Sequence, residues 1–246
     1  HRPQRTRSAK WSGRNGPGAY NLGMCGRYTL TRPAPEVADL FGLDTLPDQR
    51  PRYNIAPAQA VVAVFEPADF GRRTGERVHW GLIPFWAKDR SIGSRLINAR
   101  AETADSKPAF RAAMRYRRCL VPADGFYEWK KAADGKHPVY FRLPEGKPFA
   151  FAGLWELWEG DGTAAVLSCT VLTTEPNAAV ATAHDRMPVI LRPGDYDRWL
   201  DPTVHCPADV QGLLRPWDGE MESWPVSRTV NRPDNDTPAC IEPAEA

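Results

Sequence analysis

The chain has 246 residues, of which 42% are hydrophobic and 25% are charged, and its formal net charge is +2. This size allows one large core or two small ones, and the charged fraction is ordinary for a water-soluble protein. No run of residues reaches the apolar length of a membrane helix, and residues 1–23 lack the apolar stretch of a signal peptide.

The first 23 residues differ from the rest in composition. They carry five Lys or Arg residues and no acid, so residues 24–246 have a net charge of −3. Their glycine content and lack of periodicity predict a disordered or non-native extension: upstream sequence translated from a misassigned start, a leader removed later, or an expression scar. We therefore expect the folded region to begin at Met24, and any nucleic-acid surface must be a local patch.

The region from Met24 is rich in short strand patterns. β-branched and aromatic residues bounded by turn chemistry predict strands, and "AADG" at 132–135 and "EGDG" at 159–162 predict hairpin turns. The predicted strands are Gly26–Leu30, Ala60–Phe65, Arg77–Ile83, Arg118–Val121, Phe126–Lys130, Val139–Leu143, Phe149–Trp155, Ala165–Thr173 and Pro188–Leu191.

The predicted helices are short and few. Ser106 and Thr174 are candidate N-caps for two of them, and Pro108 suits a first helical turn. The predicted helices are Ala34–Phe41, Lys107–Arg115, Pro176–Ala183, Asp195–Leu200 and Ala208–Leu214. We expect a single α+β domain built on mostly antiparallel strands over residues 24–231, with an irregular tail at 232–246.

Five cysteines occur, at positions 25, 119, 169, 206 and 240. Their number is odd and none forms a C-x-x-C pair, which argues against a disulfide framework and a zinc site of the usual spacing. Reduced, mostly buried thiols in a cytoplasmic protein are the simplest interpretation. No ligand set for a metal or an organic cofactor is visible, so we expect no cofactor.

Cys25 stands out because it directly follows a methionine at the start of the patterned region. If translation begins at Met24 and that residue is removed, Cys25 becomes the N-terminus and carries both a free α-amine and a thiol. Their ordinary pKa values are about 7.7–8.0 and about 8.5, so both can react near neutral pH. A terminal cysteine can condense with an aldehyde to a five-membered thiazolidine, whereas an internal one cannot. The alternative is a small core residue that begins a strand.

Three polar positions could assist such chemistry. Asn98 and Arg100 in "LINARAET" are two apart, so an extended segment would direct them to one side. Glu128 lies between Tyr127 and Trp129, and a carboxylate in aromatic surroundings tends to have a raised pKa. A polar edge strand and an exposed strand glutamate are the alternatives.

His184 ends a helix-like run in "TAHDRMPVIL" and is a candidate proton carrier, although a histidine there can also simply cap a helix. Aromatic residues interleaved with cations, such as Trp86 in "HWGLIPFW", suit single-stranded nucleic acid. Trp80 or Phe85 should instead be core. Ser227 and Arg228 in "WPVSRTVN" are further candidate phosphate contacts.

Seven motifs in this order resemble those of the SRAP (SOS-response-associated peptidase) family, whose members process abasic sites. They are "MCGRY" at 24–28, "RYNIAP" at 52–57, "WGLIPFW" at 80–86, "INARAET" at 97–103, "CLVPADGFYEW" at 119–129, "HDRMPVIL" at 184–191 and "PVSRTVN" at 225–231. The resemblance runs from Met24 to about Asn231.

The resemblance implies a compact β-rich α+β fold, with two mostly antiparallel sheets forming an open barrel-like core flanked by short helices. It also implies binding of single-stranded DNA that carries an abasic site, covalent capture of the ring-opened sugar by Cys25, and a thiazolidine crosslink that shields the lesion. Lyase-type and autopeptidase activities, a monomer, and a cytoplasmic protein that joins the nucleoid when bound to DNA are further expectations.

Residue roles follow from the same resemblance. Asn98, Glu128 and His184 would join Cys25 in the reactive pocket, and the remaining matched positions would contact DNA: Arg27, Asn54, Trp86, Asn98, Arg100, Ser227 and Arg228. Two rival functions stay open: a non-covalent single-stranded DNA-binding module, and a cysteine peptidase that uses Cys25, Glu128 and His184 on peptides or on its own leader.

Overall fold

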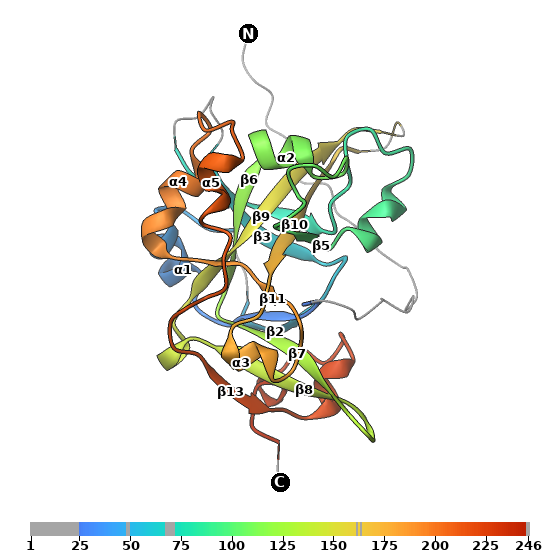
Figure 1. Ribbon diagram of the computed structural model, residues 1–246, viewed down its shortest axis with the longest axis vertical. Coiled ribbons are helices and arrows are strands. Elements are labelled where there is room, and N and C mark those ends of the chain that lie inside the picture. The colour runs from blue at the N-terminus through green and yellow to red at the C-terminus, as the bar shows by residue number, and fades with distance from the viewer. Residues whose placement is uncertain (1–24, 48–49, 67–71, 161, 163, 245–246) are drawn as a thin grey trace.

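The computed structural model describes residues 25–47, 50–66, 72–160, 162 and 164–244 (Figure 1). The expectations for residues 1–23 and for Met24 concern residues outside these ranges. The described chain forms one β-rich domain with two sheets, which confirms the predicted fold class.

One sheet has five strands in the order β13-β8-β7-β1-β2 and contains only antiparallel pairs. Its long central ladder is the hairpin of β7 and β8, in which Ala132 pairs with Gly135. Gly135 has a φ of 127°, as the predicted turn requires. The strands are β1 (Tyr28–Leu30), β2 (Arg52–Ile55), β7 (Gly125–Ala132), β8 (Gly135–Arg142) and β13 (Glu222–Pro225).

The second sheet contains eight strands in the order β11-β10-β4-β3-β6-β9-β12, with β5 beside β10. An extra ladder between β9 and β10 closes β10, β4, β3, β6 and β9 into a barrel, so the expected barrel-like core is closed. Only the pairs of β10 with β4 and β5 are parallel. The strands are β3 (Ala60–Phe65), β4 (Thr74–Trp80), β5 (Asn98–Arg100), β6 (Arg118–Ala123), β9 (Phe149–Trp158), β10 (Val166–Thr174), β11 (Met187–Pro188) and β12 (Ile190–Leu191).

Aromatic side chains join the five-stranded sheet to the barrel. The ring of Tyr28 on β1 meets Trp80 and Phe151 edge-on, with centroids 5.3 and 5.7 Å apart, and Phe126 on β7 also meets Phe151. Each of these four rings is almost fully buried. Trp80 is therefore core, as predicted for at least one of the aromatic residues in its motif, whereas Phe85 is exposed.

The short helices lie around the sheets, and several are shorter than predicted. The helix expected at Lys107–Arg115 begins at Arg111, because Lys107 and Phe110 take part in preceding turns. The Ser106 hydroxyl donates to the Thr103 carbonyl and does not cap this helix. Asn177, not Thr174, caps the next helix by accepting the Val180 N–H. The α-helices are α1 (Ala34–Phe41), α2 (Arg111–Tyr116), α3 (Ala178–Ala181), α4 (Tyr196–Leu200) and α5 (Ala208–Gln211).

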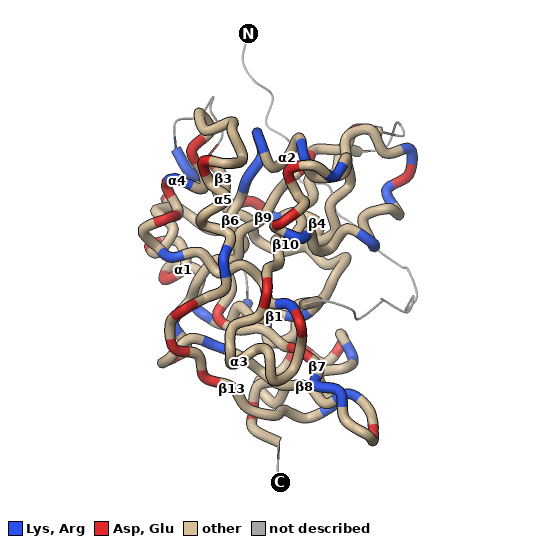
Figure 2. The backbone as a smooth tube through the Cα atoms, viewed as in Figure 1, with Lys and Arg blue, Asp and Glu red and all other residues tan. Residues whose placement is uncertain are grey.

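The C-terminal segment packs onto the five-stranded sheet. It holds the 3-10 turns η4 (Arg228–Asn231) and η5 (Pro238–Cys240), with the side chains of Val230 and Cys240 fully buried. Within the tail that was predicted to be irregular, Pro238–Cys240 thus form the short turn η5. None of the helices described has the length and apolarity to cross a lipid bilayer. In the view of Figure 2, segments with basic and acidic residues are interspersed along the tube.

Candidate functional site

Cys25 lies just before β1, at the first described position of the chain. Its side chain is buried, and its thiol forms a hydrogen bond with the Glu128 carboxyl and accepts the backbone N–H of Arg27. Its carbonyl oxygen accepts a hydrogen bond of 2.8 Å from Nδ2 of Asn98. Residues separated by 73 and 103 positions in sequence thus meet at one cysteine.

Asn98 reaches Cys25 from the barrel. It begins β5, where parallel pairing with β10 sets it opposite Val171. The side chain is 6% exposed, and its Oδ1 is buried without a hydrogen-bond partner among the described residues. A buried amide oxygen of this kind can accept a hydrogen bond from a bound molecule.

Glu128 is supplied by β7 and is 2% exposed. The pKa of this carboxyl is raised to about 8, chiefly by burial; the hydrogen bond with Cys25 offsets part of the rise, and the nearby Asp185 charge adds to it. One oxygen, Oε1, has no partner among the described residues. The carboxyl is therefore mostly protonated at neutral pH and close to the range in which it can both give and take a proton.

The thiol of Cys25 is held in its neutral form. Burial, and after it the charge of Glu128, raises the pKa of Cys25 well above its usual value. A thiolate would be unfavourable at this buried position, so the sulfur must lose its proton during reaction and not before it.

His184 follows α3 and is half-buried. Its Nδ1 accepts the backbone N–H of Arg186 at 3.0 Å and lies 3.1 Å from a carboxylate oxygen of Asp185. Nδ1 also lies 3.3 Å from the carbonyl oxygen of Arg186, so three groups hold the ring through this one nitrogen. The site thus contains an imidazole with a fixed orientation, next to the carboxylate that acts on Glu128.

A pocket of about 410 Å³ lies beside these groups. Its wall combines Lys130 and Lys131 of β7 with residues 181–185 and Pro176. Lys130 is two residues beyond Glu128 on β7, and alternation places both on the same face of the strand. Glu128 itself does not line the pocket; Asp185, which lines it beside His184, is the residue whose charge acts on Glu128.

Arg27 and Asn54, expected at the DNA surface, are buried inside a clamp on the C-terminal segment. Arg27 donates to Asn54 Oδ1 at 2.9 Å and to the carbonyls of Val230 and Asn231 at 2.6 and 3.2 Å. Asn54 donates to the carbonyls of Val230, Arg232 and Asn235. These bonds give both residues a structural role that the sequence motif does not reveal.

Arg100 and Trp86 are exposed, as DNA contacts would have to be. Arg100 ends β5, and Trp86 is 48% exposed beside Phe85 at 59%. Ser227 accepts the Thr229 N–H and caps η4. Arg228 contacts Asp134 of the β7–β8 hairpin at 3.2 Å, which partly neutralises its charge.

Arg186 is a further cation near the site, and the sequence analysis did not predict a role for it. It makes a bidentate pair with Glu102 at 2.7 and 2.8 Å and donates to the Thr173 carbonyl. This contact lowers the pKa of Glu102, to which the charge of Arg100 also contributes. The only sequence signal is its position two residues after His184.

Among the described residues, no three His, Cys, Asp or Glu side chains gather closely enough to hold a metal ion. The grouping of Cys25, Asn98 and Glu128 instead offers a nucleophile, an anchor and a proton carrier. Such a set suits covalent capture of an electrophile with transfer of protons.

Comparisons with known proteins agree with the motif resemblance. A family model described as SOS response associated peptidase (SRAP) matches residues 24–233. Abasic site processing protein YoqW of Bacillus subtilis is 42% identical over 224 residues, which are 89% of this chain and 99% of that protein. Abasic site processing protein HMCES of Gallus gallus is 30% identical, with 80% of this chain and 67% of that protein covered.

The fold recurs in a solved structure. A crystal structure of a protein from Bacteroides thetaiotaomicron matches with a TM-score of 0.78 and 25% identity, and covers 90% of this chain and 100% of its own.

Proposed function

This chain belongs to the SOS response associated peptidase (SRAP) family, and we propose that it processes abasic sites in single-stranded DNA by covalent capture. The working form would begin at Cys25, so that one residue offers an α-amine and a thiol to the ring-opened sugar aldehyde. The product would be a thiazolidine crosslink that shields the lesion. The main support for this proposal is that the buried Cys25 thiol is hydrogen-bonded to the Glu128 carboxyl, while Asn98 donates a hydrogen bond to the Cys25 carbonyl oxygen.

The first step would join the amine to the aldehyde carbon and give a carbinolamine. Loss of its hydroxyl as water needs a proton, which the protonated Glu128 carboxyl can supply because its pKa is about 8. Cleavage of the C–O bond leaves an iminium carbon and a Glu128 carboxylate. The aldehyde oxygen thus departs as one molecule of water.

The second step would close the ring. The Cys25 sulfur attacks the iminium carbon, the C–S bond forms, and the thiol proton passes to the Glu128 carboxylate to which it is hydrogen-bonded. This transfer restores the acid used in the first step. A thiol with a raised pKa suits this sequence, since its proton leaves only as the bond forms.

Asn98 and His184 would act around these two steps. The bond from Asn98 Nδ2 limits motion of the Cys25 backbone, which raises the effective concentration of the amine at the aldehyde. His184 lines the pocket beside Lys130 and Lys131 of β7, where it would exchange protons with a bound sugar. Arg100 and Trp86 would bind the DNA strand through a phosphate and a base.

The peptidase alternative has weaker support. A cysteine peptidase needs a thiolate that an imidazole activates. The Cys25 thiol is instead hydrogen-bonded to the Glu128 carboxyl, and the pKa of Cys25 is raised. Removal of the chain's own leader and lyase-type cleavage of DNA at the lesion would be further reactions of the same residues. The non-covalent binding module remains the other alternative.

One gel distinguishes these functions. A chain that begins at Cys25 is incubated with single-stranded DNA containing one abasic site, then heated in denaturant. We expect a stable shifted band in the wild-type protein and none in Cys25→Ala. DNA binding without a heat-stable band would contradict the proposal and favour the non-covalent module; cleavage of added peptides would favour the peptidase.

A further inference from the structure

Two exposed aromatic side chains lie next to each other on the turn that follows β4. Phe85 is 59% exposed and Trp86 is 48% exposed. The backbone N–H of Ala87 donates to the Pro84 carbonyl at 2.9 Å, so the two aromatic residues are the central pair of a hydrogen-bonded turn. Rings this exposed gain little from packing, and their direction therefore depends on how the backbone of the turn is held.

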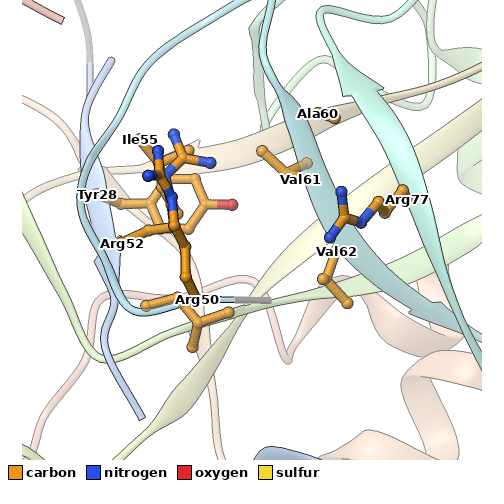
Figure 3. Close-up of a pocket in the computed structure, with 9 residues that line it drawn as sticks. Tyr28, Arg50, Arg52, Ile55, Ala60, Val61, Val62 and Arg77 are labelled. Atoms are coloured by element: carbon orange, nitrogen blue, oxygen red, sulfur yellow. The ribbon is translucent and has the colours of Figure 1, made fainter. Parts of the chain in front are cut away.

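The two rings lie outside both of the pockets described. Phe85 and Trp86 line neither the pocket beside His184 nor the pocket of about 460 Å³ between β2 and the barrel strands β3 and β4, which Figure 3 shows. A ligand of the turn therefore binds on open surface. Nucleobases bind exposed aromatic rings of this kind by stacking on them.

Hydrogen bonds fix both ends of the turn to the paired strands β9 and β10. The Ile83 N–H donates to Oγ of Ser168 on β10 at 2.9 Å, and Nε1 of Trp158 on β9 donates to the Ala87 carbonyl at 2.8 Å. Ile83, Ala87 and Trp158 also form a small buried apolar cluster of their own. Because these bonds are buried, an end of the turn cannot move without leaving a polar group unpaired.

Glu156 holds the middle of the turn. It lies on β9 opposite Ser168 and is 5% exposed. Its carboxylate accepts the backbone N–H of Phe85, and Nη2 of Arg117 donates to its Oε2 at 2.9 Å. Burial raises the pKa of Glu156, and these two contacts offset only part of the rise. A buried ion pair of this kind is a weak source of stability, but it orients the backbone group that it binds.

Strand β10 carries both the turn and the anchor of Cys25. Ser168 binds the turn, and Val171, three residues further along β10, pairs with Asn98. Three residues of extended strand span about 10 Å. The turn is thus fixed close to Asn98, which donates to the Cys25 carbonyl.

We propose that Glu156 and Ser168 are positioning residues for DNA: they orient the Phe85–Trp86 turn so that a base stacks on it while the abasic site of the same strand lies at Cys25. This inference rests on the proposed function. Both side chains are buried and act through the backbone of the turn, without contact to DNA. A ring that is oriented before binding loses less conformational entropy when a base stacks on it.

A double-mutant cycle tests the proposal on the full chain, with the anisotropy of a labelled, lesion-free single-stranded oligonucleotide as the measurement. Removal of both rings, Phe85→Ala with Trp86→Ala, should weaken binding roughly tenfold, the loss of one stacked base. Glu156→Ala should weaken it several-fold, and Glu156→Gln, which keeps an acceptor for the Phe85 N–H, should restore most of the affinity. In the chain without the two rings, Glu156→Ala should have almost no further effect.

Two further variants complete the cycle. Ser168→Ala removes the acceptor of the Ile83 N–H without changing the charge, and it should show the same dependence on the two rings. This variant decides the question if Glu156→Ala does not fold. Glu36→Ala makes the same substitution at an exposed carboxyl of α1 and should bind DNA like the wild type.

The proposal is overturned if Glu156→Ala and Ser168→Ala weaken DNA binding equally with and without the two rings, because general damage to the fold then explains the loss. It is also overturned if both bind DNA like the wild type. The heat-stable crosslink at Cys25 is measured separately. Effects independent of the rings in a chain that still crosslinks would remove this inference alone, whereas a wild-type chain that binds no single-stranded DNA would remove the proposed function as well.

Discussion

Nδ2 of Asn98 donates a hydrogen bond of 2.8 Å to the carbonyl oxygen of Cys25, and thereby ties the barrel to the residue that precedes β1. The bond acts on the backbone and leaves the Cys25 sulfur to Glu128. Asn98 thus controls where the nitrogen of Cys25 lies without touching the sulfur.

Asn98→Ala should therefore slow crosslinking more than it weakens DNA binding. Without the anchor the Cys25 amine is less well placed, and a displacement of about 1 Å can cost on the order of 100-fold in rate. The measurement is the single-turnover rate of crosslink formation at saturating DNA, together with the dissociation constant for lesion-free DNA. Equal losses in rate and in affinity would contradict the positioning role.

Glu128→Gln should become more stable than the wild type as the pH rises. Burial raises the pKa of Glu128 to about 8, whereas the pKa of glutamate in an unfolded chain is about 4.3. Between these values the folded protein keeps a proton that the unfolded chain has lost, so wild-type stability falls with rising pH. Glutamine does not titrate, and the stability gap should widen by about 1.4 kcal/mol per pH unit between about pH 5 and pH 8, then level off.

Urea unfolding at a series of pH values measures this gap. Glu222→Gln, which removes a half-buried carboxyl of β13 that is paired with Arg142, serves as the control for deleting a single negative charge. A gap between Glu128→Gln and the wild type that stays constant from pH 5 to pH 8 would show that Glu128 is ionised in the folded protein.

Arg27→Ala should destabilise the fold instead of changing how DNA binding responds to salt. The substitution leaves Asn54 Oδ1 and the Val230 carbonyl without this donor, and it removes the guanidinium that lies 5.9 Å from the Trp129 ring. We expect a loss of about 2–4 kcal/mol in the free energy of unfolding. If Arg27→Ala keeps wild-type stability and its DNA affinity becomes less sensitive to salt, then Arg27 contacts a phosphate, as predicted from the sequence.

Arg100→Ala should have the opposite profile. Arg100 is exposed at the end of β5, so its loss should leave stability almost unchanged. If it contacts one phosphate, the slope of log affinity against log salt should become shallower by about 0.7. Arg198→Ala on α4, away from β5 in Figure 1, is the matched control. An unchanged slope in Arg100→Ala would remove this residue from the phosphate contacts.

Local sequence patterns predicted the elements whose stability is local. Helix α1 has the predicted bounds because proline begins it and Gly42, with a φ of 65°, ends it. The β7–β8 hairpin follows from the turn residues at 132–135. Strand β2 was missed, since "RYNI" is too polar to resemble a buried strand; its polar groups are satisfied by Asp236 and the carbonyls after Val230.

The same distinction separates the site residues. The chemistry of Cys25 and Glu128 could be predicted from residue type and neighbours, yet their contact depends on β1 and β7 pairing across about 100 residues. The structural contacts of Arg27 and Asn54 could not be predicted, because a cation or an amide that binds a distant C-terminal carbonyl leaves no local signal in the sequence.

The most direct test of covalent capture is mass spectrometry of the N-terminal peptide after reaction with abasic single-stranded DNA, without any reducing agent. For a chain that begins at Cys25, we predict an adduct on residue 25 whose mass is the sum of both partners less one water, and which survives heating. Cys25→Ser should be trapped only after borohydride reduction, and a chain that begins at Gly23 should give no adduct at Cys25. A heat-stable adduct in the chain that begins at Gly23, or none in the chain that begins at Cys25, would contradict the account.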